Sequence, residues 1–207
     1  MTIQNRRERE IQEMKQLILK TAVELFIEEG IDNVSLRRIA DKIEYSPGSI
    51  YSYFKDKGEI ILAIHVEGFN KLHEMQLSLN SITDPLERLS KMGEVYMKFA
   101  FENPGYYDLM FIAKTVAEKI CEQEHWEAGQ RSYDYLRDTV KQCIDEGYFI
   151  DTDVDSAAFA FWSIVHGMAS LIIRGRCAMI PPEQIKNVVQ GSLKFVNKNI
   201  TVKHKEV

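Results

Sequence analysis

The chain has few of the features that mark secreted or membrane proteins. Its 207 residues include only three cysteines, which are too few and too scattered for a disulfide framework. No apolar run approaches the roughly 20 residues needed to span a bilayer, and the N-terminus lacks the apolar segment of a secretory signal. These absences predict a cytoplasmic protein without a membrane partner. We interpret Cys121, Cys143 and Cys177 as buried structural residues, with oxidant sensing as the alternative.

An excess of positive charge, the usual mark of a nucleic-acid-binding domain, is absent too. The formal net charge at pH 7 is −5, and the first 60 residues hold 10 Lys and Arg against 11 Asp and Glu. Arg6, Arg7 and Arg9 make the N-terminal arm locally basic without making the domain basic. Any contact with DNA must therefore come from the local placement of charged and polar groups.

Motifs for catalysis and for metal or cofactor binding are missing as well. The five histidines are dispersed, and no HExxH, CxxC, phosphate-binding glycine loop or nucleophile elbow is present. We therefore expect no enzyme activity, no metal and no cofactor.

What the sequence does contain is helical periodicity in almost every segment, without the alternation of strands. Capping residues mark helix starts, such as Ser35, Asp56 with Glu59, and Asp84 before Pro85, and glycines mark helix ends. These signals predict an all-α fold of about nine helices, with a small head at 1–57 and a larger body at 58–207. The expected helices span about 9–29, 36–43, 47–53, 56–79, from 85 onward, 106–112, a stretch ending at 147, 155–174 and 182–199.

Residues 35–57, SLRRIADKIEYSPGSIYSYFKDK, predict a helix-turn-helix. Ala40 is small enough for the position where the two helices cross, and Ile50, ten positions later, can lock the pair. With these inward, the exposed face and its edges are left to hydroxyl, proline and aromatic residues: Ser46, Pro47, Ser49, Tyr51, Ser52 and Tyr53. Hydroxyls can bond phosphates and base edges without the desolvation cost of a full charge. Gly48 allows close approach of the backbone to a phosphate.

A dozen spaced positions in this region resemble the N-terminal signature of the tetracycline-repressor (TetR) family. They are Gly30, Ser35, Arg37, Ile39, Ala40, Ser46, Gly48, Ile50, Tyr51, Tyr53, Phe54 and Lys57. The resemblance implies a dimer that binds a near-palindromic DNA operator, and a divergent helical body that binds a small-molecule effector.

The resemblance also implies roles for individual residues. Phosphate contacts fall to Ser35, Tyr51, Tyr53 and Lys57. Positions near the bases fall to Arg37, Pro47, Gly48 and Ser49, and Ser46 completes the predicted DNA-binding set.

One position departs from the family pattern. The family usually has Ala-Gly-Val before the serine, whereas this chain has Ile43-Glu44-Tyr45. If the backbone at Glu44 is left-handed, a residue other than glycine costs about 1 kcal/mol there. That cost is tolerable, and an altered turn is the alternative.

Two segments of the body, 96–112 and 159–173, are rich in aromatic residues and methionine. Such side chains can line an adaptable apolar cavity, although ordinary core packing would use them as well. The W-x-x-x-H-G motif at Trp162, His166 and Gly167 is similar to the C-terminal domain of one TetR subgroup. We expect an effector site among Phe101, Tyr107, Met110, Phe111, Trp162 and His166.

The last two predicted helices, 155–174 and 182–199, are the expected dimer face. The first carries small residues that allow close helix approach, and the second carries an apolar stripe at Ile185, Val188, Val189, Leu193 and Val196. Two such hairpins would form a four-helix bundle, and packing only within the chain is the alternative.

The sequence therefore predicts a homodimeric, ligand-responsive transcriptional regulator. The family resemblance favours a repressor over an activator. Two alternatives stay open: a helical enzyme-like or scaffolding protein with a degenerate head, and a DNA-binding factor that needs no ligand.

Overall fold

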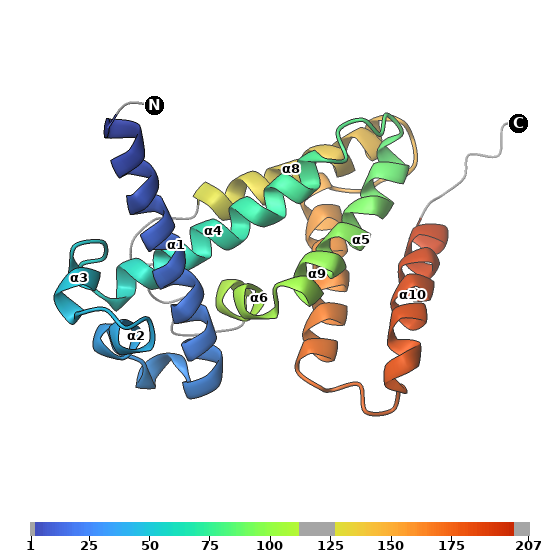
Figure 1. The fold of residues 1–207 in the computed structure, drawn as a ribbon. Coiled ribbons are helices and arrows are strands. Elements are labelled where there is room, and N and C mark those ends of the chain that lie inside the picture. Colours follow the sequence, from blue (N-terminus) through green and yellow to red (C-terminus); the bar gives the residue numbers. More distant parts are fainter. Residues whose placement is uncertain (1–2, 112–126, 201–207) are drawn as a thin grey trace, which may run out of the picture. The chain divides into compact units, whose positions relative to one another are not determined.

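The structure, a computed structural model, describes residues 3–111 and 127–200. These ranges contain nine α-helices and two short 3-10 helices, and no strand, which confirms the predicted all-α class (Figure 1). The chain forms two compact units. The first contains the described residues up to Gly68 together with 105–111, and the second contains 69–104 and 127–200. The functional division at residue 57 stays a prediction.

The first unit is built from the N-terminal helices and one later helix. Its elements are α1 (Ile3–Glu29), η1 (Ile31–Asn33), α2 (Leu36–Lys42), α3 (Pro47–Tyr51), the first part of α4 (Lys57–Leu77) and α6 (Pro104–Phe111). Helix α1 begins earlier than predicted, so the basic N-terminal residues lie on a helix and not in an extended arm. Ion pairs one turn apart, Arg6–Glu10 at 2.7 Å and Arg9–Glu13 at 3.5 Å, favour this helical extension.

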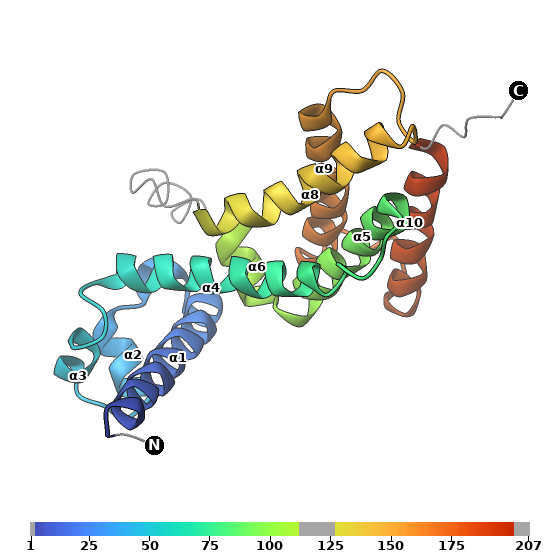
Figure 2. The same cartoon turned by 90° about the horizontal axis from the view of Figure 1, so that it is seen from above.

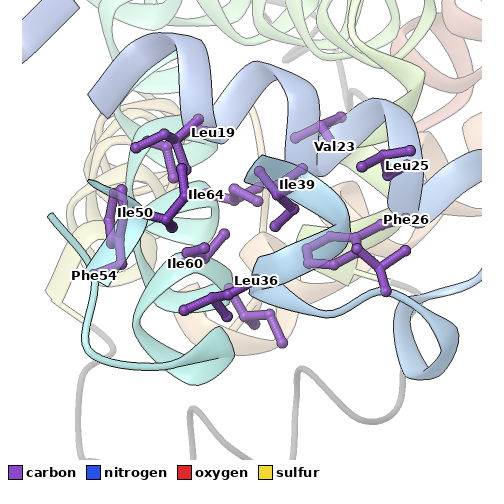
Figure 3. Packing of buried hydrophobic residues seen from close by; sticks show 14 of the residues in the cluster. Leu19, Val23, Leu25, Phe26, Leu36, Ile39, Ile50, Phe54, Ile60 and Ile64 are labelled. Carbon is purple, nitrogen blue, oxygen red and sulfur yellow. The ribbon is translucent and has the colours of Figure 1, made fainter. Parts of the chain in front are cut away.

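The core of the first unit gathers aliphatic side chains from α1, α2, α3 and α4 (Figure 3). Ala40 and Ile50 are fully buried in it, which confirms their predicted inward positions. The other fully buried aliphatic residues are Ile18, Ala22, Leu25, Ile39, Ile60 and Ile64. Burying one such side chain stabilises the fold by about 1.5–3 kcal/mol, so this core holds α3 in a single orientation.

Helix α6 belongs to the first unit because two glycines let it approach its neighbours closely. A Cβ atom at Gly105 would lie 2.7 Å from Cγ1 of Val23 on α1. A Cβ atom at Gly68 on α4 would collide with the side chain of Met110. The hydroxyl of Tyr106 donates a hydrogen bond of 2.8 Å to Glu67 Oε1 on α4. Helix α6 is therefore packed as part of the N-terminal unit.

The second unit is a helical body. It contains the rest of α4, α5 (Pro85–Glu102), α8 (Glu127–Asp145), α9 (Val154–Ile173), η2 (Pro182–Gln184) and α10 (Ile185–Ile200). Buried side chains of α5, α8 and α9, including Leu89, Val140 and Ala158, form one apolar cluster. The predicted last helix begins as the short 3-10 helix η2, at the proline pair Pro181-Pro182.

The cysteine positions agree in part with the sequence interpretation. Cys143 is fully buried in this cluster, and burial raises the pKa of its thiol to about 12, which keeps it protonated and unreactive. Cys177 is half-buried, and Cys121 lies outside the described residues.

Capping signals in the sequence locate most helix ends correctly. The carboxylate of Asp84 accepts hydrogen bonds from the backbone N–H groups of Leu86 and Glu87 at the start of α5. Gly147 and Gly175 adopt positive φ values of 77° and 64° just beyond α8 and α9. Glycine adopts this conformation without strain, and helices commonly end this way.

Helix α9 corrects the expectation about apolar runs. Among the described residues it is the one helix long and apolar enough to cross a bilayer, judged by length and composition alone. The sequence interpretation missed this because Ser163 and His166 interrupt the run without lowering its mean hydropathy enough. A single helix of this kind is weak evidence for a membrane span.

Candidate nucleic-acid interface

Two serines fix the starts of the helix pair α2–α3. The Oγ atom of Ser35 accepts a hydrogen bond of 3.2 Å from the backbone N–H of Arg38, and so caps α2. The Oγ atom of Ser46 accepts one of the same length from Ser49, with Pro47 as the first residue of α3. A serine cap typically contributes about 1 kcal/mol to helix stability. Both serines are thus needed by the fold, whatever else they contact.

The turn between α2 and α3 is left-handed at Glu44. Its φ is 60°, a region that favours glycine. The N–H of Tyr45 donates to the carbonyl of Ala40 at 3.0 Å, and that of Glu44 donates to Asp41 at 3.3 Å. These two bonds form the Schellman motif that ends many helices. The turn therefore closes in the ordinary way, with Glu44 bearing the predicted strain.

The outer side of α3 presents Gly48 and Tyr51 to solvent, while Ile50 is buried. Tyr51 is 59% exposed, so the core makes little use of its ring. A Cβ atom at Gly48 would meet only Ser46 Oγ, at an ordinary distance of 3.8 Å. The fold thus does not require glycine at this position.

Tyr53 and Phe54 differ in their surroundings. Phe54 is buried in the core of the first unit, and Tyr53 packs against that core while remaining partly exposed. The ring of Tyr53 therefore has a packing role, and a phosphate contact by its hydroxyl stays a prediction.

The cations of the head are engaged to different degrees. Arg37 is exposed and takes part in no ion pair within the described part of the chain. Its neighbour Arg38 forms a forked ion pair with Glu29, with a shortest N–O distance of 2.6 Å. The Nζ atom of Lys57 donates 2.8 Å to the carbonyl of Ile31 and thereby ties the start of α4 to η1. The sequence carried no signal for this contact, because it joins residues far apart in the chain.

Comparison with known families agrees with this geometry. Residues 18–64 match the model described as bacterial regulatory proteins, tetR family. Residues 89–192, about half of the chain, match the tetracyclin repressor-like C-terminal domain. The chain belongs to the TetR family of transcriptional regulators. It is therefore a DNA-binding regulator and not an enzyme.

Individual relatives are distant but extend over most of the chain. The HTH-type transcriptional regulator YobS of Bacillus subtilis is 25% identical over 164 residues, 77% of this chain and 79% of its own length. AcrR of Shigella flexneri is 26% identical over 151 residues, 66% of each chain.

Solved structures share the fold of this regulator. The fatty acid degradation regulator FadR from Bacillus halodurans superposes with a TM-score of 0.74 at 17% identity, covering 93% of this chain and 97% of its own. The ketosteroid transcriptional regulator KstR2 of Mycobacterium tuberculosis gives 0.71 at 21% identity, covering 92% and 96%.

The predicted effector residues are divided between the two compact units. Tyr107 and Met110 are buried in the first unit, where the ring of Tyr107 also lies tilted against that of Phe111, with centroids 5.3 Å apart. Phe101 belongs to the second unit and is exposed on α5. A role of these residues in ligand binding stays a prediction.

The other two predicted residues lie together on α9 in the second unit. The rings of Trp162 and His166 are 6.1 Å apart, and His166 Nδ1 lies 3.1 Å from the hydroxyl of Tyr96 on α5. Burial lowers the pKa of His166, which favours the neutral imidazole. Sequence reasoning missed Tyr96 and also Tyr133, whose ring lies 6.1 Å from Trp162, because both come from other helices. The subgroup suggested by the W-x-x-x-H-G motif stays a prediction.

The strain at Glu44 leads to a stability prediction. Replacing Glu44 with glycine should raise the free energy of unfolding by about 1 kcal/mol, because glycine adopts the left-handed backbone without strain. Urea denaturation followed by circular dichroism measures the change. Glu44→Ala is the matched control, since it removes the same carboxylate but keeps a Cβ atom and the strain. Equal gains in the two variants would show that strain is not the cause.

Proposed function

We propose that this TetR-family regulator is a cytoplasmic repressor that binds a near-palindromic operator as a homodimer. We further propose that a small apolar or amphipathic effector lowers its operator affinity. The observation that carries the proposal is the outer side of α3. Gly48 and Tyr51 are exposed there, and the packing of the fold requires neither a glycine at position 48 nor a tyrosine at position 51.

The proposed DNA-facing role of α3 rests on these two exposed residues, Gly48 and Tyr51, because the fold gains no stability from either. Gly48 is the second residue of α3, and glycine is a poorer helix former than alanine, by at most about 1 kcal/mol in a helix interior. An exposed tyrosine ring leaves apolar area in water. A phosphate that approaches the backbone at Gly48 and a hydroxyl donor at Tyr51 would account for both. Arg37, exposed and outside any described ion pair, supplies a charge-assisted donor from α2.

The homodimer is supported by apolar side chains that the chain itself leaves uncovered. Phe159 on α9 is 58% exposed and Phe195 on α10 is 67% exposed. Figure 1 shows that α9 and α10 run antiparallel. A Cβ atom at Gly167 or Gly191 would meet nothing within 4 Å, so both helices have room for a close neighbour. Two such helix pairs could bury these faces in a four-helix bundle.

The apolar stripe predicted for the last helix is only partly available for this purpose. Val189 and Leu193 are buried within the second unit, where Leu193 packs against Gly93 of α5. Val188 is exposed, and so is Phe195, which the sequence interpretation left out. The proposed dimer face of α10 therefore centres on Val188 and Phe195.

The effector class is inferred from the aromatic side chains around Trp162. The rings of Tyr133 and His166 each lie 6.1 Å from that of Trp162, and the hydroxyl of Tyr96 lies 3.1 Å from His166 Nδ1. Burial lowers the pKa of His166, which favours its neutral form. Such a group offers apolar contact and a few hydrogen bonds, but no full charge. Two proteins of similar fold are named as a fatty acid degradation regulator and a ketosteroid transcriptional regulator. Fatty acids and ketosteroids are both largely apolar compounds.

The DNA-binding proposal is tested by selecting an operator and then removing the glycine. The full-length protein would be used to enrich duplexes from a random library, and we expect a near-palindrome. Gly48→Ala should weaken binding to that duplex at least tenfold in an anisotropy titration, because the added methyl group occupies the space of a phosphate. The same variant should unfold at equal or higher urea concentration, since alanine is the better helix former.

Tyr51→Phe is a second variant that removes only a hydroxyl, and it should weaken binding to a smaller degree. Enrichment of no palindrome, or Gly48→Ala binding as tightly as the wild type, would contradict the proposed interface.

The dimer face gives a separate prediction. Phe195→Lys should convert the dimer to a monomer at micromolar concentration, because a charge would be buried in the interface. Sedimentation velocity measures the change, and circular dichroism should show an unchanged helix content. Ile150→Lys is the matched control, because Ile150 is also an exposed apolar residue of the second unit but lies outside α9 and α10. A dimer that survives Phe195→Lys would place the interface elsewhere.

A further inference from the structure

The second half of α4 has a buried stripe with one polar member. Phe69, Leu72 and Gln76 recur at the spacing of one helix face. Leu79 follows just beyond the end of α4, and all four residues are buried. Gln76 is only 7% exposed. An amide at an otherwise apolar position costs free energy unless its polar atoms are hydrogen-bonded. The partners of the Gln76 amide therefore decide what the residue contributes.

Gln76 is bonded at both ends to a single residue of α8. Its Nε2 donates 3.3 Å to the backbone carbonyl of Ser132, and its Oε1 accepts 2.8 Å from the hydroxyl of the same serine. Ser132 is itself 5% exposed. Both bonds require one relative position of the two residues. A slip of α4 by one helical turn, about 5.4 Å, would break both and leave buried polar groups without partners.

Two further exposed bonds join α8 to Asn70 of α4 and to Asn80, which lies three residues beyond the end of α4. Arg131 Nη2 donates 2.8 Å to Asn70 Oδ1, and the hydroxyl of Tyr135 donates 2.8 Å to Asn80 Oδ1. The ring of His73 also meets that of Tyr135 edge-on, at 6.2 Å. We refer to the three hydrogen-bonded pairs Asn70–Arg131, Gln76–Ser132 and Asn80–Tyr135 as the polar ladder.

The rest of α8 and the rest of α4 are held differently. Val140 and Cys143 of α8 are buried in the apolar cluster of the second unit. Ile60 and Ile64 of α4 are buried in the core of the first unit. Apolar contacts tolerate some sliding, whereas directional bonds between buried polar groups do not. A single buried polar residue in an apolar helix seam is well known to fix helix register at some cost in stability.

Helix α4 is continuous from Lys57 to Leu77 and so passes from one unit into the other (Figure 2). Because the backbone of α4 is one continuous helix, a slip of its second half along α8 would be transmitted to its first half. One helical turn, about 5.4 Å, exceeds the rise of one base pair, about 3.4 Å. Register on α8 is thus large enough to matter for an operator with two half-sites.

We propose that the polar ladder fixes the register of α4 on α8 and thereby sets the half-site spacing that the dimer accepts. This inference rests on the proposed function, a dimer on a palindromic operator. Gln76 and Ser132 act as positioning residues, since they influence DNA only through α4.

The test uses the double variant Gln76→Leu/Ser132→Ala in the full-length protein, which completes the apolar stripe. Its unfolding midpoint in urea should equal or exceed that of the wild type, because an apolar pair replaces a buried polar one. Binding is titrated on the selected palindrome and on duplexes whose centre is one base pair shorter or longer. We expect the wild type to prefer its own spacing at least tenfold, and the double variant to prefer it threefold or less.

Two further variants make the readout specific. Tyr135→Phe removes the exposed hydrogen bond to Asn80 and keeps the aromatic ring, so it should lower the spacing preference partially. Gln130→Ala is the control, because the amide of Gln130 bonds Asp134 on α8 itself and not α4. It should leave the preference unchanged.

The outcomes separate this inference from the proposed function. If the wild type prefers one spacing and the double variant retains that preference, the polar ladder does not set it. A uniform loss of affinity at all spacings would also overturn the inference, because it indicates general destabilisation. If the wild type binds no palindrome, the proposed function and this inference both fail.

Discussion

The burial of Ile50 against α2 is the interaction on which the proposed DNA-binding surface depends. Ile50, Ile39 and Ala40 are completely excluded from solvent, and α3 is too short to hold its orientation without them. Once Ile50 points inward, Gly48 and Tyr51 must point outward. The chemistry available to DNA is therefore decided by packing at a crossing of two short helices.

This arrangement suits a regulator whose head has no excess of positive charge. Affinity has to come from few contacts that are well placed, and well-placed contacts need a stable scaffold. The capping serines, the left-handed turn at Glu44 and the bond from Lys57 to Ile31 all fix the backbone around α3. The strained residue Glu44 is tolerated there because its cost of about 1 kcal/mol is small beside the free energy contributed by burial of the aliphatic core.

The sequence predicted those features that depend on neighbours along the chain. Periodicity and capping residues predicted the helices. At Glu44 the sequence left a strained left-handed backbone and an altered turn open, and the structure has the left-handed backbone. The sequence did not predict contacts between distant helices. The packing of Gly105 against Val23, the pair Gln76–Ser132 and the meeting of Tyr96 with His166 all depend on tertiary placement, which periodicity does not encode. Phe195 was missed because its exposure is decided by how α10 packs.

The claim that placed groups, and not bulk charge, supply the affinity is tested most directly by the salt dependence of operator binding. If the cations Arg37 and Lys57 of each protomer contact the DNA, a dimer neutralises about four phosphates, and the logarithm of the affinity should fall with that of the salt concentration at a slope of about −4. A scrambled duplex of the same length should bind about a thousandfold more weakly at physiological salt. A slope near −10 with equal affinity for both duplexes would contradict the account.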